Sequence, residues 1–283
     1  MIIALTGATG QLGRLVVDHL LARGADAPEV VAIVRDEAKA APLAELGVQV
    51  RVAAYGDVPA LTAALDGVDR LLLISGSEVG QRVAQHASVL EAAQAAGVGF
   101  VAYTSATRAD VSDLVLAPEH RETEALLRGS GLRVAVLRNN WYHENHAAAV
   151  QEAAATGRVT TSTGTGRVAS ASRSDYAEGA AVVLLGDGDD EVLEFGGDTA
   201  WSPSEFAEAA SVAVGKPVTA NVVSREEHLE ALRAAGLDEG TAGFVTALDA
   251  NIAAGDLDVV TGDLSRLIGH PTQPLAEGLA RLA

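Results

Sequence analysis

A glycine-rich turn directly after the first apolar run constrains this chain more than any other feature. Residues Ile2–Thr6 form a short apolar run, which predicts a buried strand, and glycine then occupies every third position from Gly7 to Gly13. Apolar residues continue at helical spacing from Leu12 as far as Leu21. The local order is therefore strand, glycine turn, helix.

That order predicts a phosphate-binding loop. The spacing is G-x-x-G-x-x-G, at Gly7, Gly10 and Gly13, and differs from the commoner G-x-G-x-x-G of dinucleotide-binding turns. Residues without a Cβ let the backbone come close to a pyrophosphate, and the helix that follows points its free N–H groups at the anion. The alternative is a tight turn whose glycines only allow the helix to pack on the strand.

Composition and charge exclude several classes of partner and chemistry. The 283 residues are 48% hydrophobic and carry a formal net charge of −18, so nucleic acid and anionic membranes are not expected partners. With no cysteine, thiolate catalysis and disulfides are excluded. We expect no metal site, no membrane span, no signal peptide and a cytoplasmic protein, as a monomer or a homodimer.

Short β-rich runs alternate with amphipathic helical segments over the first half of the chain, which predicts βαβ units. Right-handed crossovers then give a doubly wound parallel sheet of the Rossmann type, with ligand at the carboxyl ends of the strands. After the first run, the strands are expected at 30–34, 48–53, 71–75, 100–104, 133–137 and 192–195.

Beyond Arg138 the regular alternation of strand-like and helical segments ends. Residues 160–166 are rich in Gly, Thr and Ser and are expected to form a loop, while helices are expected at 203–214, 225–235, 239–254 and 274–283. We therefore expect residues 1–155 and 171–198 to form the dinucleotide-binding domain. Residues 156–170 and 199–283 are expected to form a smaller carboxyl-terminal α/β lobe that binds the substrate.

The end of the second strand bears on the choice of dinucleotide. Arg35 lies where this fold places the adenosine ribose, and its planar guanidinium suits a 2′-phosphate, which favours NADPH. Asp36 would serve NAD if it pointed inward, but it can equally cap the following helix. Lys39 is either a second cation at the phosphate or a solvent-facing lysine.

Two further segments lie at the same edge of the predicted sheet. Asp57 is expected to be a helix N-cap rather than an adenine contact. Ser75 and Ser77 stand in a loop of small residues after the fourth strand, where backbone can approach the ribose on the nicotinamide side. An ordinary polar turn is the alternative reading of that loop.

The chain lacks the acid that short-chain reductases use to protonate an alkoxide. None of its four tyrosines has a lysine four residues later, and Lys39 and Lys216 are the only lysines. A quinone that accepts hydride becomes a far weaker base than an alkoxide and can be protonated by water or a histidine. The missing dyad favours an electron-poor acceptor, or a protein with no redox chemistry.

Several strings together resemble the NmrA-like branch of atypical short-chain dehydrogenases, and within it the bacterial NADPH:quinone oxidoreductases of type 2. The likeness extends over nearly the whole chain and departs from the group at Asn140, where a glycine is usual. The strings are Gly7–Gly13, Val31–Arg35, Leu71–Ser75, Ser77–Gln81, Leu137–Tyr142 and Leu267–Thr272.

The resemblance implies NADPH as cofactor and a quinone as the small-molecule substrate stacked beside it. It places the cofactor against the glycine loop, the arginine after strand two, the serine loop and the loop near the nicotinamide. The residues so implied are Gly7, Thr9, Gly10, Gln11, Leu12, Arg35, Ser75, Ser77, Asn139, Trp141 and Tyr142.

Three residues are candidates for a catalytic role. His120 stands where related isoflavone and lignan reductases have a catalytic lysine, and it either donates a proton or is a polar residue in the first turn of a helix. Asn139 and Tyr142 are candidates for hydrogen bonds to a quinone or carboxamide oxygen. Trp141 is either a core anchor or a stacking surface.

The leading hypothesis is hydride transfer from NADPH to a quinone, with the cofactor supplying the chemistry. The rival is an NmrA-like regulator that senses NADP without turning it over. A third reading, reduction of another small electron-poor acceptor, shares the fold.

Overall fold

Seven strands form one sheet, in the order β3-β2-β1-β4-β5-β6-β8, in a computed structural model that describes residues 1–78, 80–187 and 190–283. The pairings among β1 to β6 are parallel, and the order of these six is that of a doubly wound dinucleotide-binding sheet. The strands are β1 (Ile3–Thr6), β2 (Val30–Val34), β3 (Gln49–Val52), β4 (Arg70–Leu73), β5 (Phe100–Ala106), β6 (Arg133–Asn139) and β8 (Glu191–Phe195).

The predicted doubly wound parallel sheet is confirmed, and its central strands are buried on both faces. Every residue of β1, β2 and β5 is buried, which is why these strands read as continuous apolar runs rather than alternating ones. Their side chains and those of the flanking helices form one core that includes Leu65, Leu71 and Tyr103.

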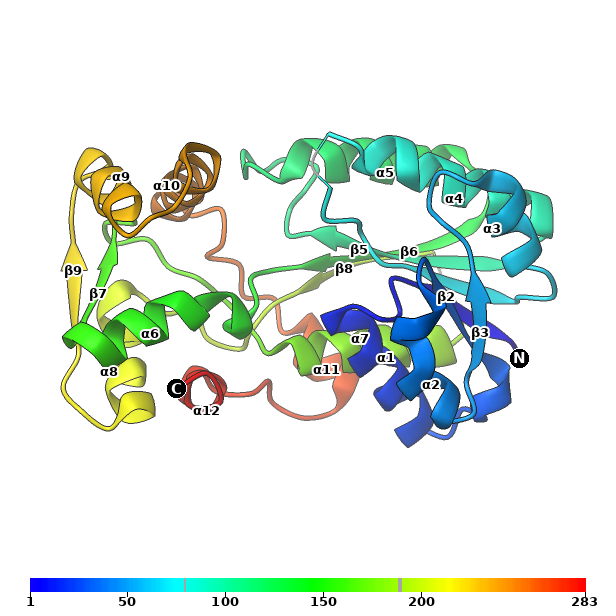
Figure 1. The fold of residues 1–283 in the computed structure, drawn as a ribbon, viewed down its shortest axis with the longest axis horizontal. Helices are drawn as coiled ribbons and strands as arrows, with labels where there is room; N and C mark the ends of the chain where they lie inside the picture. Colours follow the sequence, from blue (N-terminus) through cyan, green and yellow to red (C-terminus); the bar gives the residue numbers. More distant parts are fainter. Residues whose placement is uncertain (79, 188–189) are drawn as a thin grey trace. The chain divides into compact units, whose positions relative to one another are not determined.

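Helices cover both faces of this sheet. Figure 1 shows α3, α4 and α5 on one face, with α1 and α7 packed along each other on the opposite face. The helices and short 3-10 turns of this part are α1 (Gln11–Ala22), η1 (Ala27–Glu29), η2 (Glu37–Ala40), α2 (Ala41–Glu45), α3 (Val58–Ala64), α4 (Arg82–Ala96), α5 (Ala117–Gly129) and α7 (Arg173–Leu185).

The chain divides into two compact units. The first contains residues 1–109, 118–139 and 173–193, and the second contains 110–117, 140–172 and 194–283. Residues 110–117, 140–155, 171–172 and 194–198, expected in the dinucleotide-binding domain, fall instead within the second unit, and α6 accounts for the longest of these segments. The reason is that Val150 and Ala153 of α6 (Ala147–Thr156) pack in the core of that unit, with Phe206.

The second unit contains a two-stranded parallel sheet. It pairs β7 (Arg158–Thr161) with β9 (Thr219–Val222), so the loop expected over 160–166 is wrong at its first two residues. The sequence pattern predicts a strand-like segment at 218–223, where β9 lies, but it did not indicate that this segment pairs with residues before α8. The remaining elements are η3 (His143–His146), α8 (Pro203–Val214), α9 (Arg225–Ala234), α10 (Glu239–Ala253), α11 (Asp263–Ile268) and α12 (Leu275–Ala280).

Within the described residues, no helix is long and apolar enough to cross a membrane. The same residues contain no group of three or more His, Asp or Glu side chains placed to hold a metal ion.

Candidate functional site

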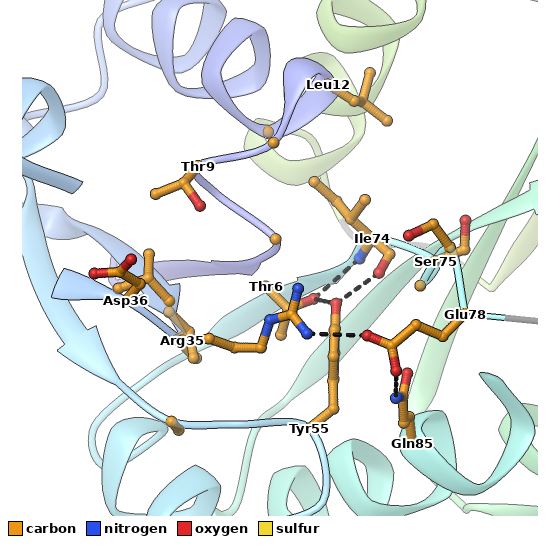
Figure 2. A pocket seen from close by; sticks show the side chains of 18 of the residues that line it. Thr6, Thr9, Leu12, Arg35, Asp36, Tyr55, Ile74, Ser75, Glu78 and Gln85 are labelled. Carbon is orange, nitrogen blue, oxygen red and sulfur yellow. Dashed lines mark hydrogen bonds and ion pairs between the residues drawn. The ribbon is translucent and has the colours of Figure 1, made fainter. Parts of the chain in front are cut away.

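The carboxyl ends of β1, β2 and β4 open into a pocket of about 550 Å³ in the first unit (Figure 2). The glycine turn forms one wall of this pocket, the end of β2 a second, and the loop after β4 a third. Eight of the residues expected to hold the cofactor line it, namely Gly7, Thr9, Gly10, Gln11, Leu12, Arg35, Ser75 and Ser77.

The glycine turn brings the start of α1 very close to the end of β1. Gly7 has φ +63°, a left-handed conformation that favours glycine. A Cβ at Gly13 would lie 2.7 Å from Ala8 Cα, so only glycine lets the first turn of α1 pack against the strand. Local backbone geometry therefore requires glycine at both positions. This requirement alone is also compatible with the alternative in which the turn only packs the helix on the strand and binds no ligand.

The backbone amides at the start of α1 favour phosphate binding, because helix packing gives them no hydrogen-bond partner. The first N–H that bonds back into the helix is that of Arg14, 3.1 Å from the carbonyl oxygen of Gly10. The N–H groups of Gln11, Leu12 and Gly13 precede it, at the positive end of the helix dipole, and all three residues line the pocket. No acidic side chain occupies this first turn, so an anion meets no repulsion there.

Arg35 follows β2 and lies at the mouth of the pocket with 68% of its side chain exposed. Its Nη1 is 3.0 Å from Glu78 Oε1, and the other oxygen of Glu78 accepts from Gln85 at 2.8 Å. Figure 2 shows this chain of contacts reaching from the end of β2 to α4. Hydrogen bonds from Gln85 and Arg35 lower the pKa of Glu78, so its carboxylate is charged at neutral pH.

The residues beside Arg35 have partners within the chain, and whether Asp36 or Lys39 contacts the adenosine ribose or its phosphate stays a prediction. Asp36 Oδ1 accepts from the Ala38 amide at 3.0 Å and caps η2, while Lys39 Nζ stands 3.9 Å from Asp36. Both side chains also line the pocket. Asp57 accepts from the Ala60 amide at 3.0 Å, so the predicted N-cap of α3 is confirmed.

Tyr55 joins three strand ends and was not singled out from the sequence. Its hydroxyl is 2.8 Å from the carbonyl oxygen of Ile74 and 2.9 Å from Thr6 Oγ1 (Figure 2). Burial raises the pKa of Tyr55 to about 12, so the hydroxyl stays neutral. Its place directly after the third strand, at the carboxyl edge of the sheet, was the available signal.

Buried polar side chains hold the serine loop. The Ser75 amide donates to Thr104 Oγ1 at 2.8 Å. The Gly76 amide donates to His86 Nε2 at 3.1 Å, and the Gly76 carbonyl accepts from Arg82 Nε at 2.8 Å. Since His86 Nε2 accepts, the neutral ring carries its proton on Nδ1, which faces Thr123 Oγ1. Burial lowers the pKa of His86 to about 4, which keeps this arrangement at neutral pH.

The string Ser77–Gln81 includes Val79, which lies outside the described residues, as do Gly188 and Asp189. The described part of that string reaches the first turn of α5, where the Gly80 amide donates to Glu119 Oε1 at 2.7 Å.

His120 does not line the pocket. It is 5% exposed, and its Nδ1 is 2.8 Å from the Tyr103 hydroxyl. Burial and the nearby charge of Arg82 lower the pKa of His120 to about 3, so the ring is neutral at neutral pH. A proton-donating role for His120 stays a prediction, and it is restricted to the N–H of a neutral ring.

The string near the expected nicotinamide is shared between the two units. Asn139 ends β6 in the first unit and is buried, and its carbonyl oxygen accepts from the Thr107 amide at 3.0 Å. Trp141 and Tyr142 belong to the second unit, where they run beside Ala171. Their contacts with a cofactor stay predictions.

Asn140, where the resemblance predicts a glycine, has a structural role in the second unit. Its side-chain oxygen accepts from the Trp141 amide at 2.7 Å, and its side-chain nitrogen donates to the Leu257 carbonyl at 3.2 Å. The asparagine therefore fixes a turn that a glycine would leave to the backbone alone.

Comparison with known proteins agrees with this pocket. The model of the NAD(P)H-binding family matches residues 7–185, which include the glycine turn, Arg35 and the serine loop. The chain belongs to this family. The resemblance drawn from the sequence motifs is confirmed, because the chain is 47% identical over 281 residues to quinone oxidoreductase 2 of Escherichia coli strain K12, covering 99% of this chain and 98% of that protein.

Two solved structures match the chain at full length. The NADPH-dependent quinone oxidoreductase QOR2 of Escherichia coli, complexed with NADPH, aligns with a TM-score of 0.95 at 47% identity over 99% of each chain. Triphenylmethane reductase of Citrobacter sp., complexed with NADP(H), aligns with a TM-score of 0.95 at 35% identity over the whole of both chains.

Proposed function

We propose that this family member is an NADPH-dependent quinone oxidoreductase. The observation that carries the proposal is the full-length likeness to quinone oxidoreductase 2 in a chain whose pocket offers three free amides and an arginine. When bound, NADPH supplies a hydride to the acceptor, which then gains a proton to give the hydroquinone. Quinones suit a chain without a Tyr-x-x-x-Lys dyad, because their reduced oxygens are weak bases.

The pocket fits the phosphates of the cofactor. The pyrophosphate is assigned to the amides of Gln11, Leu12 and Gly13, which open α1 and belong to residues that line the pocket. The 2′-phosphate is assigned to Arg35, whose guanidinium matches a phosphate in two hydrogen bonds. Because Glu78 already holds Arg35, the phosphate has to compete with that carboxylate.

The chain's own groups orient the cofactor and contribute little acid–base chemistry. Tyr55, His86 and Arg82 hold the strand ends and the serine loop in place. Burial raises the pKa of Tyr55 to about 12 and lowers that of His86 to about 4, so both stay neutral near neutral pH. Asn139 and Tyr142 are proposed to bond a carboxamide or acceptor oxygen, and Trp141 to provide a flat surface beside it. Water supplies the proton if the neutral His120 does not.

The assay is oxidation of NADPH, followed by its near-ultraviolet absorbance, with benzoquinone or menadione as acceptor. The proposal predicts acceleration over a buffer control and slower turnover with NADH. Tight binding of NADPH with no acceleration would favour the sensing role instead. Turnover confined to dyes would favour another electron-poor acceptor, an alternative supported by the likeness to triphenylmethane reductase.

A further inference from the structure

Two polar side chains of α5, Glu119 and Thr123, are largely withdrawn from solvent. They lie four residues apart, which places them on one face of the helix. Thr123 is fully buried, and the side chain of Glu119 is 21% exposed. Burial of a polar group costs free energy unless the group finds a hydrogen-bond partner. The partners of these two side chains therefore indicate what this face of α5 contributes.

The carboxylate of Glu119 joins both ends of the serine loop. Its Oε1 accepts from the Gly80 amide at 2.7 Å, and its Oε2 accepts from Arg82 Nη1 at 2.7 Å. The side chain of Arg82 is 6% exposed, and its Nε donates to the Gly76 carbonyl oxygen at 2.8 Å. Gly80 is thus tied to Glu119 directly, and Gly76 is tied to it through the guanidinium of Arg82.

Thr123 supports the same loop by a second route. Its hydroxyl donates to the Glu119 carbonyl oxygen at 2.9 Å and accepts from His86 Nδ1 at 3.0 Å. Nε2 of His86 in turn accepts from the Gly76 amide. The amide and the carbonyl of Gly76 are therefore both fixed by side chains of α4 that bond to α5.

The segment held in this way is a wall of the proposed cofactor pocket. The lining includes Ser75, Gly76, Ser77 and Glu78, and residues 74–77 belong to no helix or strand. The shape of this wall therefore depends on bonds from side chains that stand behind it.

Folding stability alone explains the pair of Arg82 and Glu119 poorly. A buried ion pair can often be replaced by apolar side chains without loss of stability, because removal of both charges from water is costly. The planar guanidinium of Arg82 instead supplies two donors in fixed directions, one for Glu119 and one for the Gly76 carbonyl. Such a geometry suits a pair that fixes the shape of a loop.

We propose that Arg82 and Glu119 are positioning residues for cofactor binding, which hold the serine loop in its binding shape before the cofactor arrives. The loop is expected to contact the ribose on the nicotinamide side, a part that NADPH and NADH share. Loss of the pair should therefore weaken binding of both cofactors equally, whereas loss of Arg35 should weaken NADPH alone. The inference rests on the proposed binding of a nicotinamide cofactor and not on the identity of the acceptor.

Fluorescence titration with NADPH and with NADH tests the pair in two variants. Arg82→Lys keeps the positive charge but cannot bond Glu119 and the Gly76 carbonyl in the directions of the fork. Glu119→Gln leaves one oxygen for the Gly80 amide and turns an NH₂ group toward Arg82, which has only donors to offer. Each variant is expected to lose about tenfold in affinity for both cofactors.

Glu178→Gln is the matched control. Glu178 of α7 pairs with Arg23, directly after α1, and its side chain is 16% exposed, close to the value for Glu119. The same charge is removed from the same unit, but the affinities for NADPH and NADH should not change. Urea unfolding of all three variants measures the loss of stability separately from the loss of affinity.

Three outcomes of the titrations would overturn the proposal. The first is unchanged affinity in both the Arg82 and the Glu119 variants. The second is a loss confined to NADPH, which would trace the effect to the 2′-phosphate and Arg35. The third is an equal loss in the Glu178 variant, which would show a general effect of stability.

Amide hydrogen exchange of the wild type tests the same claim without any substitution, so it decides the matter even if a variant fails to fold. In the cofactor-free protein, the Gly76 and Gly80 amides should exchange at least about a hundredfold more slowly than in an unfolded chain. Exchange at the rate of an unfolded chain until NADPH is added would overturn the proposal, because the cofactor would then shape the loop.

The NADPH assay separates this inference from the proposed function. A wild type that reduces benzoquinone, with both variants binding NADPH as tightly as the wild type, would reject the inference and leave the function standing. A wild type that binds NADPH and reduces no quinone, with both variants binding it about tenfold more weakly, would reject the function and keep the inference.

Discussion

Two pockets of this molecule differ in how the chain builds them. The cofactor pocket is made of short consecutive segments, each following a strand of one sheet, and its most important donors are backbone amides of residues 11–13. A second pocket, of about 140 Å³ in the second unit, is lined by residues of η3, of strands β7 and β9 and of four helices, α6, α8, α9 and α10. A site of the first kind can be predicted from local sequence patterns. A site of the second kind can be recognised only when the fold is known.

The largest expected effect comes from closing the space at the glycine turn. Gly13→Ala places a methyl group 2.7 Å from Ala8 Cα, so the backbone of Gly7 and Ala8 must move to admit it. The free energy of unfolding should therefore fall by about 2–3 kcal/mol. NADPH affinity should fall at least tenfold, since the amides at residues 11–13 shift with the backbone. Urea unfolding and a fluorescence titration with NADPH measure the two effects.

Gly243→Ala is the matched control in the second unit. A Cβ there meets open space within α10, so this variant should be unchanged or slightly stabilised, by about 0.5–1 kcal/mol. If the Gly13 variant bound NADPH as tightly as the Gly243 variant, the pyrophosphate would not lie against this turn.

Acid should weaken both units through buried histidines. The pKa is lowered to about 4 for His86 and about 3 for His120 and His146, each below the value of the unfolded chain. Between about pH 6.5 and those values the unfolded chain binds more protons, so stability is complete above about pH 6.5 and falls with pH, by about 2 kcal/mol per histidine at about pH 5.

Replacement of one histidine in each unit divides this acid response between the units. His86→Gln should remove the part of the acid-induced loss of stability that His86 causes. It should also loosen the serine loop, because His86 accepts a hydrogen bond from the Gly76 amide. His146→Phe should remove the part of the acid-induced loss of stability that His146 causes, and it should leave NADPH affinity unchanged. Urea unfolding at about pH 7.5 and about pH 5 checks both. An acid response that neither variant reduces would show that other groups cause it.

The smallest effect concerns the carboxylate that competes for Arg35. The ion pair between Glu78 and Arg35 is exposed, and such pairs contribute about 0–1 kcal/mol, so Glu78→Gln should tighten NADPH binding by up to about fivefold. NADH, which has no 2′-phosphate, should gain little. Glu45→Gln, which removes an exposed charge outside the pocket, is the control. Weaker binding of both cofactors in Glu78→Gln would mean that this carboxylate contacts the ribose instead.

Sequence pattern predicted the parts of the fold that depend on local order. β2 and α8 were predicted with their observed bounds, and the capping roles of Asp36 and Asp57 follow from their places before helices. Thr160 and Thr161 of β7 were predicted as loop because they open a segment rich in Gly, Thr and Ser, and the pairing partner β9 comes only after α8.

The candidate site was predicted to a similar extent. Glycines and an arginine that directly follow predicted strands can be recognised from the sequence alone. Tyr55 and Glu78 cannot, because their hydrogen bonds reach partners in other strands and helices. The partners of His86 and Arg82, which hold Gly76, likewise follow from the packing of α4 and not from any motif. The second unit begins earlier than expected because α6 packs with α8, a contact that no spacing in the sequence reveals.

The central claim is that the amides at residues 11–13 and the guanidinium of Arg35 hold the phosphates of NADPH. It is tested most directly by titrating the wild type and Arg35→Ala with NADPH and with NADH. We expect the variant to lose at least tenfold in affinity for NADPH, about 1.5–3 kcal/mol for a charged hydrogen bond, with NADH affinity almost unchanged. Equal losses for the two cofactors would contradict the claim.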